Sequence, residues 1–74
     1  MSIVDLKPGD KALVDYILGN KKLTKRLLAL GCIEGTPVLL KRVAPLGDPL
    51  IINFKGFDLA IRKKDAKSIL LKEV

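Results

Sequence analysis

The chain has 74 residues with 14 Lys or Arg and 8 Asp or Glu, a formal net charge of +6, no His and a single Cys. Without His it lacks an imidazole base, the Ser-His-Asp and Cys-His catalytic pairs, and any His metal ligand. One Cys cannot form an internal disulfide or a four-Cys zinc site, so the composition predicts a small non-catalytic domain that folds on its apolar core alone.

The chain is expected to be one cytoplasmic domain over residues 1–74. Its first residues do not combine a basic stretch with a long apolar run, as a secretion signal does. No apolar run approaches the roughly 20 residues of a membrane span, so the chain is not expected to cross a membrane itself. The lone thiol, Cys32, fits a reducing compartment.

A turn and a strand are the first elements expected. Pro8 fixes φ and Gly9 tolerates many values of φ, so the pair favours a chain reversal before a strand over residues 11–18. One set of alternating positions in this strand is uniformly apolar, and we expect that face to be buried. The set consists of Ala12, Val14, Tyr16 and Leu18.

The hydrophobic period then changes to that of a helix over residues 21–30. Asn20 is a candidate N-cap, because its side-chain carbonyl can accept a hydrogen bond from an unpaired backbone N–H. Gly31 is expected to end the helix where a positive φ is favoured. Three leucines share the helix face that should cover the core: Leu23, Leu27 and Leu30.

Four more short strands, separated by turn residues, complete the chain. They are expected over residues 38–43, 50–55, 57–62 and 68–74, with Gly56 linking two of them as a hairpin and one helical turn at 63–66. Their buried faces should carry Leu50, Ile52 and Phe54, then Phe57, Leu59 and Ile61, then Ile69 and Leu71. A small sheet that curls on itself removes its edges and encloses one core. We therefore predict a mainly β fold, a small SH3-like, partly open barrel of about five strands with one short helix after the first strand.

Five motifs in a particular order cover nearly the whole chain. They are LKPGD at 6–10, RLLALG at 26–31, CIEGT at 32–36, APLGDP at 44–49 and, after Gly56, LAIRKKDA at 59–66. Together they resemble the FeoA family, the small cytoplasmic component of the bacterial ferrous iron transport system. One departure is Cys32, where the family more often has another apolar residue.

The resemblance implies an SH3-like barrel and a regulatory or supportive partnership with FeoB, a membrane iron transporter with a cytoplasmic GTP-binding domain. The same fold occurs as the C-terminal domain of iron-dependent repressors of the diphtheria toxin repressor type. This chain has no helix-turn-helix part, so a repressor role would need another protein.

The loop over residues 44–49 is the first candidate contact. Its two prolines restrict the loop, and Leu46 at its tip can serve as an apolar anchor, because a rigid loop loses less entropy on binding. The alternative is that Leu46 folds back onto the barrel while Pro45, Gly47 and Pro49 only turn the chain.

Leu28 is the second candidate. It lies about 100° from Leu27 on a helical wheel, outside the core-facing stripe. If exposed, it forms an apolar centre beside the basic residues Lys25 and Arg26, which is an ordinary interface pattern. The alternative is that Leu28 packs against the strand that starts at Val38.

Basic residues form two groups along the chain, and these favour an acidic partner, an anionic membrane face or a nucleic acid, or else only a solvated surface. The groups are Lys21, Lys22, Lys25 and Arg26, and Arg62, Lys63, Lys64 and Lys67. Nucleic-acid binding by a β-barrel usually adds aromatic stacking platforms. The aromatic residues here are Tyr16, Phe54 and Phe57, and both Phe lie on predicted core faces, so nucleic acid is not the expected partner.

No catalytic, cofactor or metal site is predicted. Cys32 is interpreted as a small buried hydrophobic residue rather than a redox sensor or metal ligand. The eight acidic residues are scattered without a close pair, so iron binding by carboxylates is not expected.

We therefore predict a non-enzymatic module that binds the cytoplasmic part of a FeoB-like transporter and modulates it through Lys25, Arg26, Leu28 and Leu46. The alternative is a small basic barrel that binds nucleic acid or acts with a repressor. A GTPase-activating role with Arg26 as an arginine finger is a third possibility, without local support. Self-association stays open.

Overall fold

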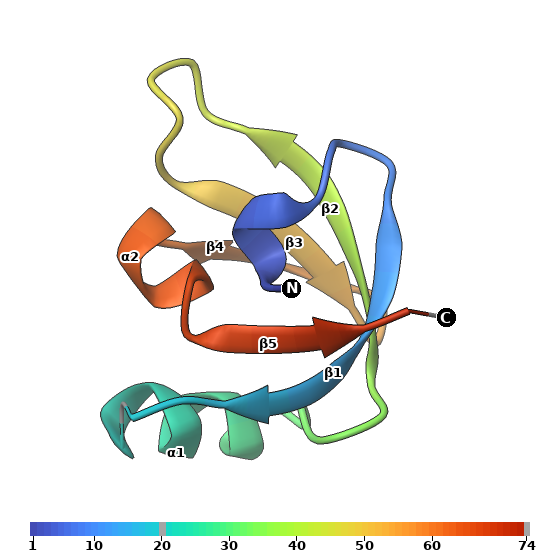
Figure 1. Cartoon of the computed structure of the whole chain (residues 1–74), viewed down its shortest axis with the longest axis vertical. Helices are drawn as coiled ribbons and strands as arrows, with labels where there is room; N and C mark the ends of the chain where they lie inside the picture. The colour runs from blue at the N-terminus through green and yellow to red at the C-terminus, as the bar shows by residue number, and fades with distance from the viewer. Residues whose placement is uncertain (20, 74) are drawn as a thin grey trace.

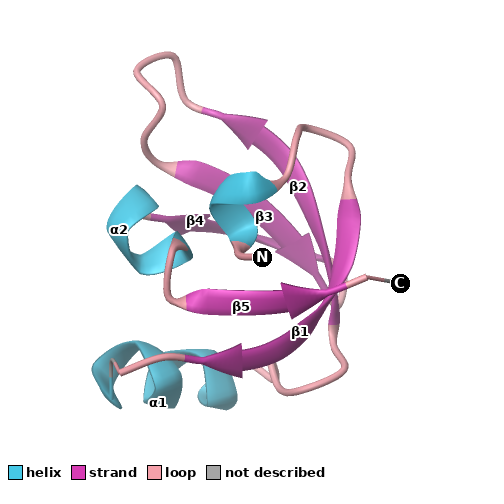
Figure 2. Cartoon of the chain, viewed as in Figure 1, coloured by secondary structure: helices cyan, strands magenta, loops and turns pink. Residues whose placement is uncertain are grey.

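The computed structural model describes residues 1–19 and 21–73. Strands curl around a shared interior, with short helical segments beside them (Figure 1, Figure 2). In chain order the elements are η1 (Ile3–Asp5), β1 (Lys11–Ile17), α1 (Lys21–Ala29), β2 (Pro37–Val43), β3 (Leu50–Phe54), β4 (Phe57–Ile61), α2 (Lys63–Ala66) and β5 (Ile69–Lys72). The predicted mainly β fold with a helix after the first strand is confirmed. None of the helices in the described ranges is long and apolar enough to cross a lipid bilayer.

The strands form one antiparallel sheet in the order β4-β3-β2-β1-β5. Two register irregularities interrupt it, one in β1 after Val14 and one in β2 after Leu40. Such bulges bend a strand and increase its twist, so they help the sheet to curve around its buried face. The helical turn α2 connects the two edge strands β4 and β5 (Figure 1).

Alternate strand side chains fill the interior. The predicted buried faces of β3 and β5 are confirmed, with Leu50, Ile52, Phe54, Ile69 and Leu71 all buried. The 3-10 helix η1 was not predicted, yet it contributes the fully buried Ile3 to the same core.

The predicted buried face of β1 is correct only in its first half. Ala12 and Val14 are buried, but Tyr16 and Leu18 are about half exposed, so that part of the prediction is wrong. The pairing of β1 with β5 shifts register between Val14 and Tyr16. Because an extra residue exchanges the inward and outward positions of a strand, Ile17 packs against the core in their place.

Helix α1 packs on the core as predicted. Leu23 and Leu27 are buried, and Leu30, just beyond the helix, is half-buried against the same cluster. An amphipathic face of this kind supplies most of the stability of a short helix. The predicted N-cap, Asn20, lies outside the described residues.

The end of α1 follows the prediction in detail. Gly31 has a φ of +85°, which favours glycine because a Cβ is strained there. The amide of Cys32 donates to the carbonyl of Leu27 at 2.8 Å, and the amide of Gly31 donates to the carbonyl of Leu28 at 3.0 Å. This pair of bonds is the Schellman motif, and it turns the chain toward β2.

The predicted hairpin between β3 and β4 is also present. Lys55 and Gly56 both have positive φ values, 51° and 85°, as a two-residue type I′ turn requires. The expectation that Phe57 is buried is wrong, since it is 39% exposed. It sits beside the turn, where its ring covers the buried Phe54 at a centroid separation of 4.7 Å and keeps its outer side in solvent.

Candidate interaction surface

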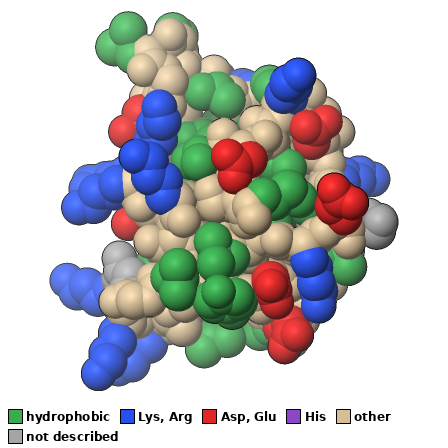
Figure 3. Space-filling model, viewed as in Figure 1, with side chains coloured by type: hydrophobic (Ala, Val, Ile, Leu, Met, Phe, Trp, Pro, Cys, Tyr) green, Lys and Arg blue, Asp and Glu red, His purple; other side chains and the backbone are tan. Residues whose placement is uncertain are grey.

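The loop between β2 and β3, residues 44–49, projects beyond the sheet (Figure 1). Leu46 is 96% exposed, and hydrophobic side chains protrude at the tip of this loop in Figure 3. The interpretation in which Leu46 folds back onto the barrel is therefore wrong. A side chain that covers none of its own core is available to contact another molecule.

Hydrogen bonds hold this loop in one shape. The Gly47 amide donates to the Ala44 carbonyl at 2.7 Å, and the Ala44 amide donates to the Pro49 carbonyl at 3.0 Å. The carboxylate of Asp48 accepts a hydrogen bond from the backbone amide of Lys63 at 3.0 Å. This last bond joins the loop to the first residue of α2 and so restricts the position of the loop relative to that helix.

A groove runs from the loop to α1. It has a volume of about 790 Å³ and is lined by Arg26, Leu46, Asp48, Pro49, Ala60, Arg62 and Asp65. We call it the loop groove. It brings together two of the predicted site residues, Arg26 and Leu46, from opposite halves of the sequence. Asp48 and Arg62 also line this groove, but the sequence analysis did not include them among the site residues. For Asp48, its position between the two prolines of the loop could have indicated a place in the site.

A second hollow adjoins the loop groove between α1 and α2. It has a volume of about 510 Å³ and is lined by Lys22, Leu23, Arg26, Arg62, Lys64 and Asp65. We call it the basic cleft. The two basic groups of the sequence meet here, and Arg26 and Arg62 line both hollows.

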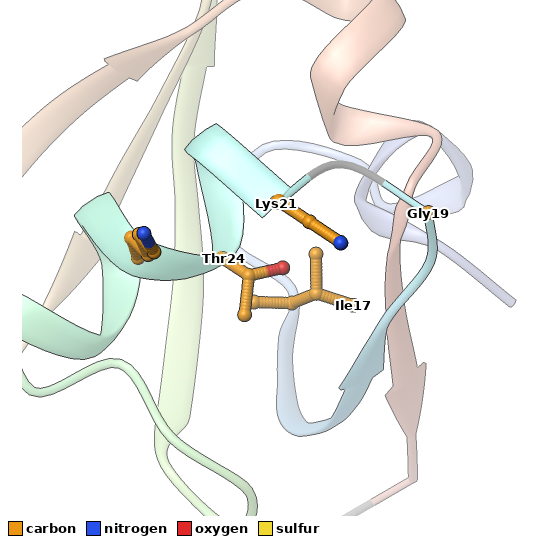
Figure 4. A pocket seen from close by; sticks show the side chains of 5 residues that line it. Ile17, Gly19, Lys21 and Thr24 are labelled. Atoms are coloured by element: carbon orange, nitrogen blue, oxygen red, sulfur yellow. The ribbon is translucent and has the colours of Figure 1, made fainter.

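Leu28 and Lys25 lie on the other side of α1. Leu28 is 53% exposed, so the interpretation that it packs against β2 is wrong. It lines a shallow groove with residues of β1 and with Ile33, while Lys25 lines a neighbouring groove with Ile17 and Thr24. Figure 4 shows Ile17 of β1 and Thr24 of α1 pointing toward each other there. The four predicted residues thus form two pairs rather than one patch.

Cys32 is completely buried. Burial raises the pKa of its thiol, and the nearby positive charge of Lys55 offsets part of that rise. A buried thiol with a raised pKa is a poor nucleophile and a poor metal ligand. The interpretation of Cys32 as a core residue is therefore confirmed.

Ion-binding chemistry is sparse over the described part of the chain. No group of three or more His, Cys, Asp or Glu residues comes together within residues 1–19 and 21–73. The hollows described above are lined by cations, aliphatic carbon and isolated carboxylates. The loop groove and the basic cleft therefore combine charged groups with apolar carbon, as protein contact surfaces do.

A curved five-stranded sheet with a stiff exposed loop and a basic cleft defines a small β-barrel domain. The model of the FeoA domain matches residues 1–73, and the chain belongs to the FeoA family. This agrees with the resemblance carried by the five sequence motifs.

Solved structures confirm the fold. The FeoA protein from Chlorobium tepidum is 34% identical, with a TM-score of 0.94 over 100% of this chain and 70% of that chain. FeoA from Stenotrophomonas maltophilia, crystallised with zinc and described as a prokaryotic SH3 domain protein, is 26% identical with a TM-score of 0.84 over 97% of this chain and 89% of that chain. The predicted SH3-like fold is therefore confirmed.

A curated relative joins two proteins in one chain. The Fe(2+) transport protein A/Fe(2+) transporter FeoB fusion protein of Porphyromonas gingivalis is 29% identical over 69 residues, which are 93% of this chain. This chain spans only 8% of the length of that fusion protein. The match therefore concerns a small part of the fusion protein.

Proposed function

We propose that this protein is a non-enzymatic, cytoplasmic accessory of ferrous iron uptake that binds the cytoplasmic part of a FeoB-type transporter and modulates it. The observation that carries the proposal is the Porphyromonas gingivalis fusion, in which a segment related to this chain and a FeoB transporter share one polypeptide. Fusion keeps two domains at a high effective concentration, which favours a contact between them. The Stenotrophomonas maltophilia protein, described as a candidate activating factor of bacterial ferrous iron transport, supports a modulating role.

The loop groove is the contact we propose. Leu46 supplies an exposed apolar anchor, and the loop that carries it is tied to α2 through Asp48. Arg26 and Arg62, together with Asp48 and Asp65, give this anchor a charged rim. An apolar centre with a charged rim and little flexibility is the pattern of an efficient protein contact.

Leu28 and Lys25 form a second proposed contact on the opposite side of α1. Leu46 and Leu28 line different grooves. The two proposed contacts can therefore be tested separately, with one substitution at Leu46 and another at Leu28.

The test is co-purification of tagged protein with the transporter, with and without a GTP analogue. Leu46→Glu should lower the affinity by about 30-fold or more, because truncating or charging a central anchor costs 2 kcal/mol or more. Leu28→Glu introduces the same charge at another exposed leucine, which is 53% exposed, and serves as the comparison. A loss only with Leu46→Glu supports the loop groove, and a loss only with Leu28→Glu moves the contact to the other side of α1. Equal recovery of wild type and both variants would contradict the proposed surface.

A further inference from the structure

The charge of the molecule is concentrated on one side. Eight exposed cations lie on α1, on α2 and directly beside α2: Lys21, Lys22, Lys25, Arg26, Arg62, Lys63, Lys64 and Lys67. We call them the basic edge. Figure 3 shows Lys and Arg side chains along the edge of the molecule where α2 and the start of α1 lie.

The basic edge accounts for the whole net charge. Two acids, Asp48 and Asp65, lie among its eight cations, which leaves a surplus of six. The other six cations and six acids of the chain cancel, and the net charge is +6. The rest of the molecule therefore has no formal net charge, and the surplus of positive charge lies on this side.

The charged groups of the basic edge form no ion pair within the described residues. Within residues 1–19 and 21–73, ion pairs join Lys41 to Asp58 at 3.1 Å and Lys72 to Glu34 at 3.6 Å. Neither pair includes a basic-edge residue. Four unpaired cations surround the basic cleft with one carboxylate, Asp65, which leaves an excess of positive charge to attract an external anion.

We infer that the basic edge docks the protein on an anionic phospholipid surface. Six of its eight cations are Lys, a residue depleted from protein–protein interfaces but typical of polybasic segments that bind anionic lipids, where each cation raises the affinity about fivefold. The cleft has no aromatic lining residue, unlike the stacking platforms that hold single-stranded nucleic acid. An anionic membrane needs neither a stacking platform nor a matching apolar pocket.

The inference goes beyond binding to a transporter and does not depend on it. Arg26 and Arg62 line both the basic cleft and the loop groove, so a protein held on a membrane by its basic edge keeps the loop groove close to the lipid surface. A membrane protein is a natural partner at that location, but lipid binding is measurable without one.

Vesicle sedimentation with purified full-length protein tests the inference. Vesicles of phosphatidylcholine with phosphatidylglycerol should bind the protein, vesicles of phosphatidylcholine alone should not, and binding should be lost in about 0.5 M salt, where the screening length falls to a few ångströms. Lys22→Glu combined with Lys64→Glu should weaken binding at least about 25-fold, from the fivefold effect of each cation. Both side chains are exposed and leave the loop groove intact.

A charge-matched control separates local from overall charge. Lys7→Glu combined with Lys11→Glu changes the net charge equally at exposed positions away from α1 and α2 and should retain binding within about fivefold of wild type. If circular dichroism shows that the first double variant is unfolded, Lys63→Glu combined with Lys67→Glu replaces it with the same expected loss. The inference is overturned if phosphatidylglycerol vesicles do not bind the protein, or if the control loses as much affinity as the variant with Lys22→Glu and Lys64→Glu. It is also overturned if the protein binds duplex DNA or polyglutamate more tightly than these vesicles.

Discussion

Leu46 is held in solvent by a loop that two backbone hydrogen bonds brace. A leucine in that position contributes little to folding, because almost none of its surface leaves water when the chain folds. Leu27, in contrast to Leu46, is completely buried in the core. We therefore expect a substitution at Leu46 to affect partner binding and a substitution at Leu27 to affect the stability of the fold.

This contrast gives a prediction about stability. Leu46→Ala should change the free energy of unfolding by less than about 0.5 kcal/mol, whereas Leu27→Ala should cost about 2–5 kcal/mol. Urea denaturation followed by circular dichroism measures both. A large loss of stability in Leu46→Ala would mean that the leucine packs onto the protein in solution and is not a free anchor.

A pH prediction follows from Asp58. Asn53 donates a hydrogen bond to its carboxylate at 2.7 Å and Lys41 donates another at 3.1 Å, and these hold the pKa of Asp58 below its ordinary 3.8. Because the folded pKa is lowered, the stability from this carboxylate is present above pH 3.8 and is lost as the pH falls through the folded pKa. Asp58→Asn should therefore be less stable than wild type at neutral pH, and the difference should shrink as the pH falls below 3.8. A difference that stays constant over that range would contradict this account.

At the scale of the elements, the hydrophobic period predicted the types of β3, α1 and β5 because each has one uninterrupted apolar face. The same reasoning failed in β1, where Tyr16 and Leu18 continue the apolar alternation but face outward. The bulge after Val14 depends on how β1 pairs with β5, which is more than 50 residues away in sequence. Local periodicity contains no information on such a long-range register.

The loop and α2 form a unit through Asp48. Asp48→Ala should cost about 0.5–1.5 kcal/mol, the usual net value of one hydrogen bond, and should speed hydrogen exchange at the amides of Gly47 and Lys63. Asp10→Ala is the matched control, since the Asp10 carboxylate accepts a comparable bond from the Lys7 amide at 2.9 Å. The control should leave exchange at Gly47 unchanged. Equal exchange at Gly47 in wild type and Asp48→Ala would show that the prolines alone fix the loop.

At the scale of the whole molecule, the candidate site depends on how distant segments meet. For both Leu46 and Leu28, the sequence allowed an exposed position as one of two alternatives. That Arg26 meets Leu46 in one groove, and that Leu28 lies on the other side of α1, depends on how α1 packs across the barrel. The two basic groups likewise become one basic edge only because α1 and α2 lie side by side over the basic cleft.

The central claim is that the loop groove is the surface that a FeoB-type transporter contacts. The most direct measurement is an NMR titration of isotope-labelled protein with the cytoplasmic part of the transporter. The account predicts that chemical shift changes concentrate at residues 44–49 and at Arg26 and Arg62, and that Leu46→Glu abolishes them. Changes confined to Tyr16, Leu28 and Ile33, or none at saturating partner, would contradict it.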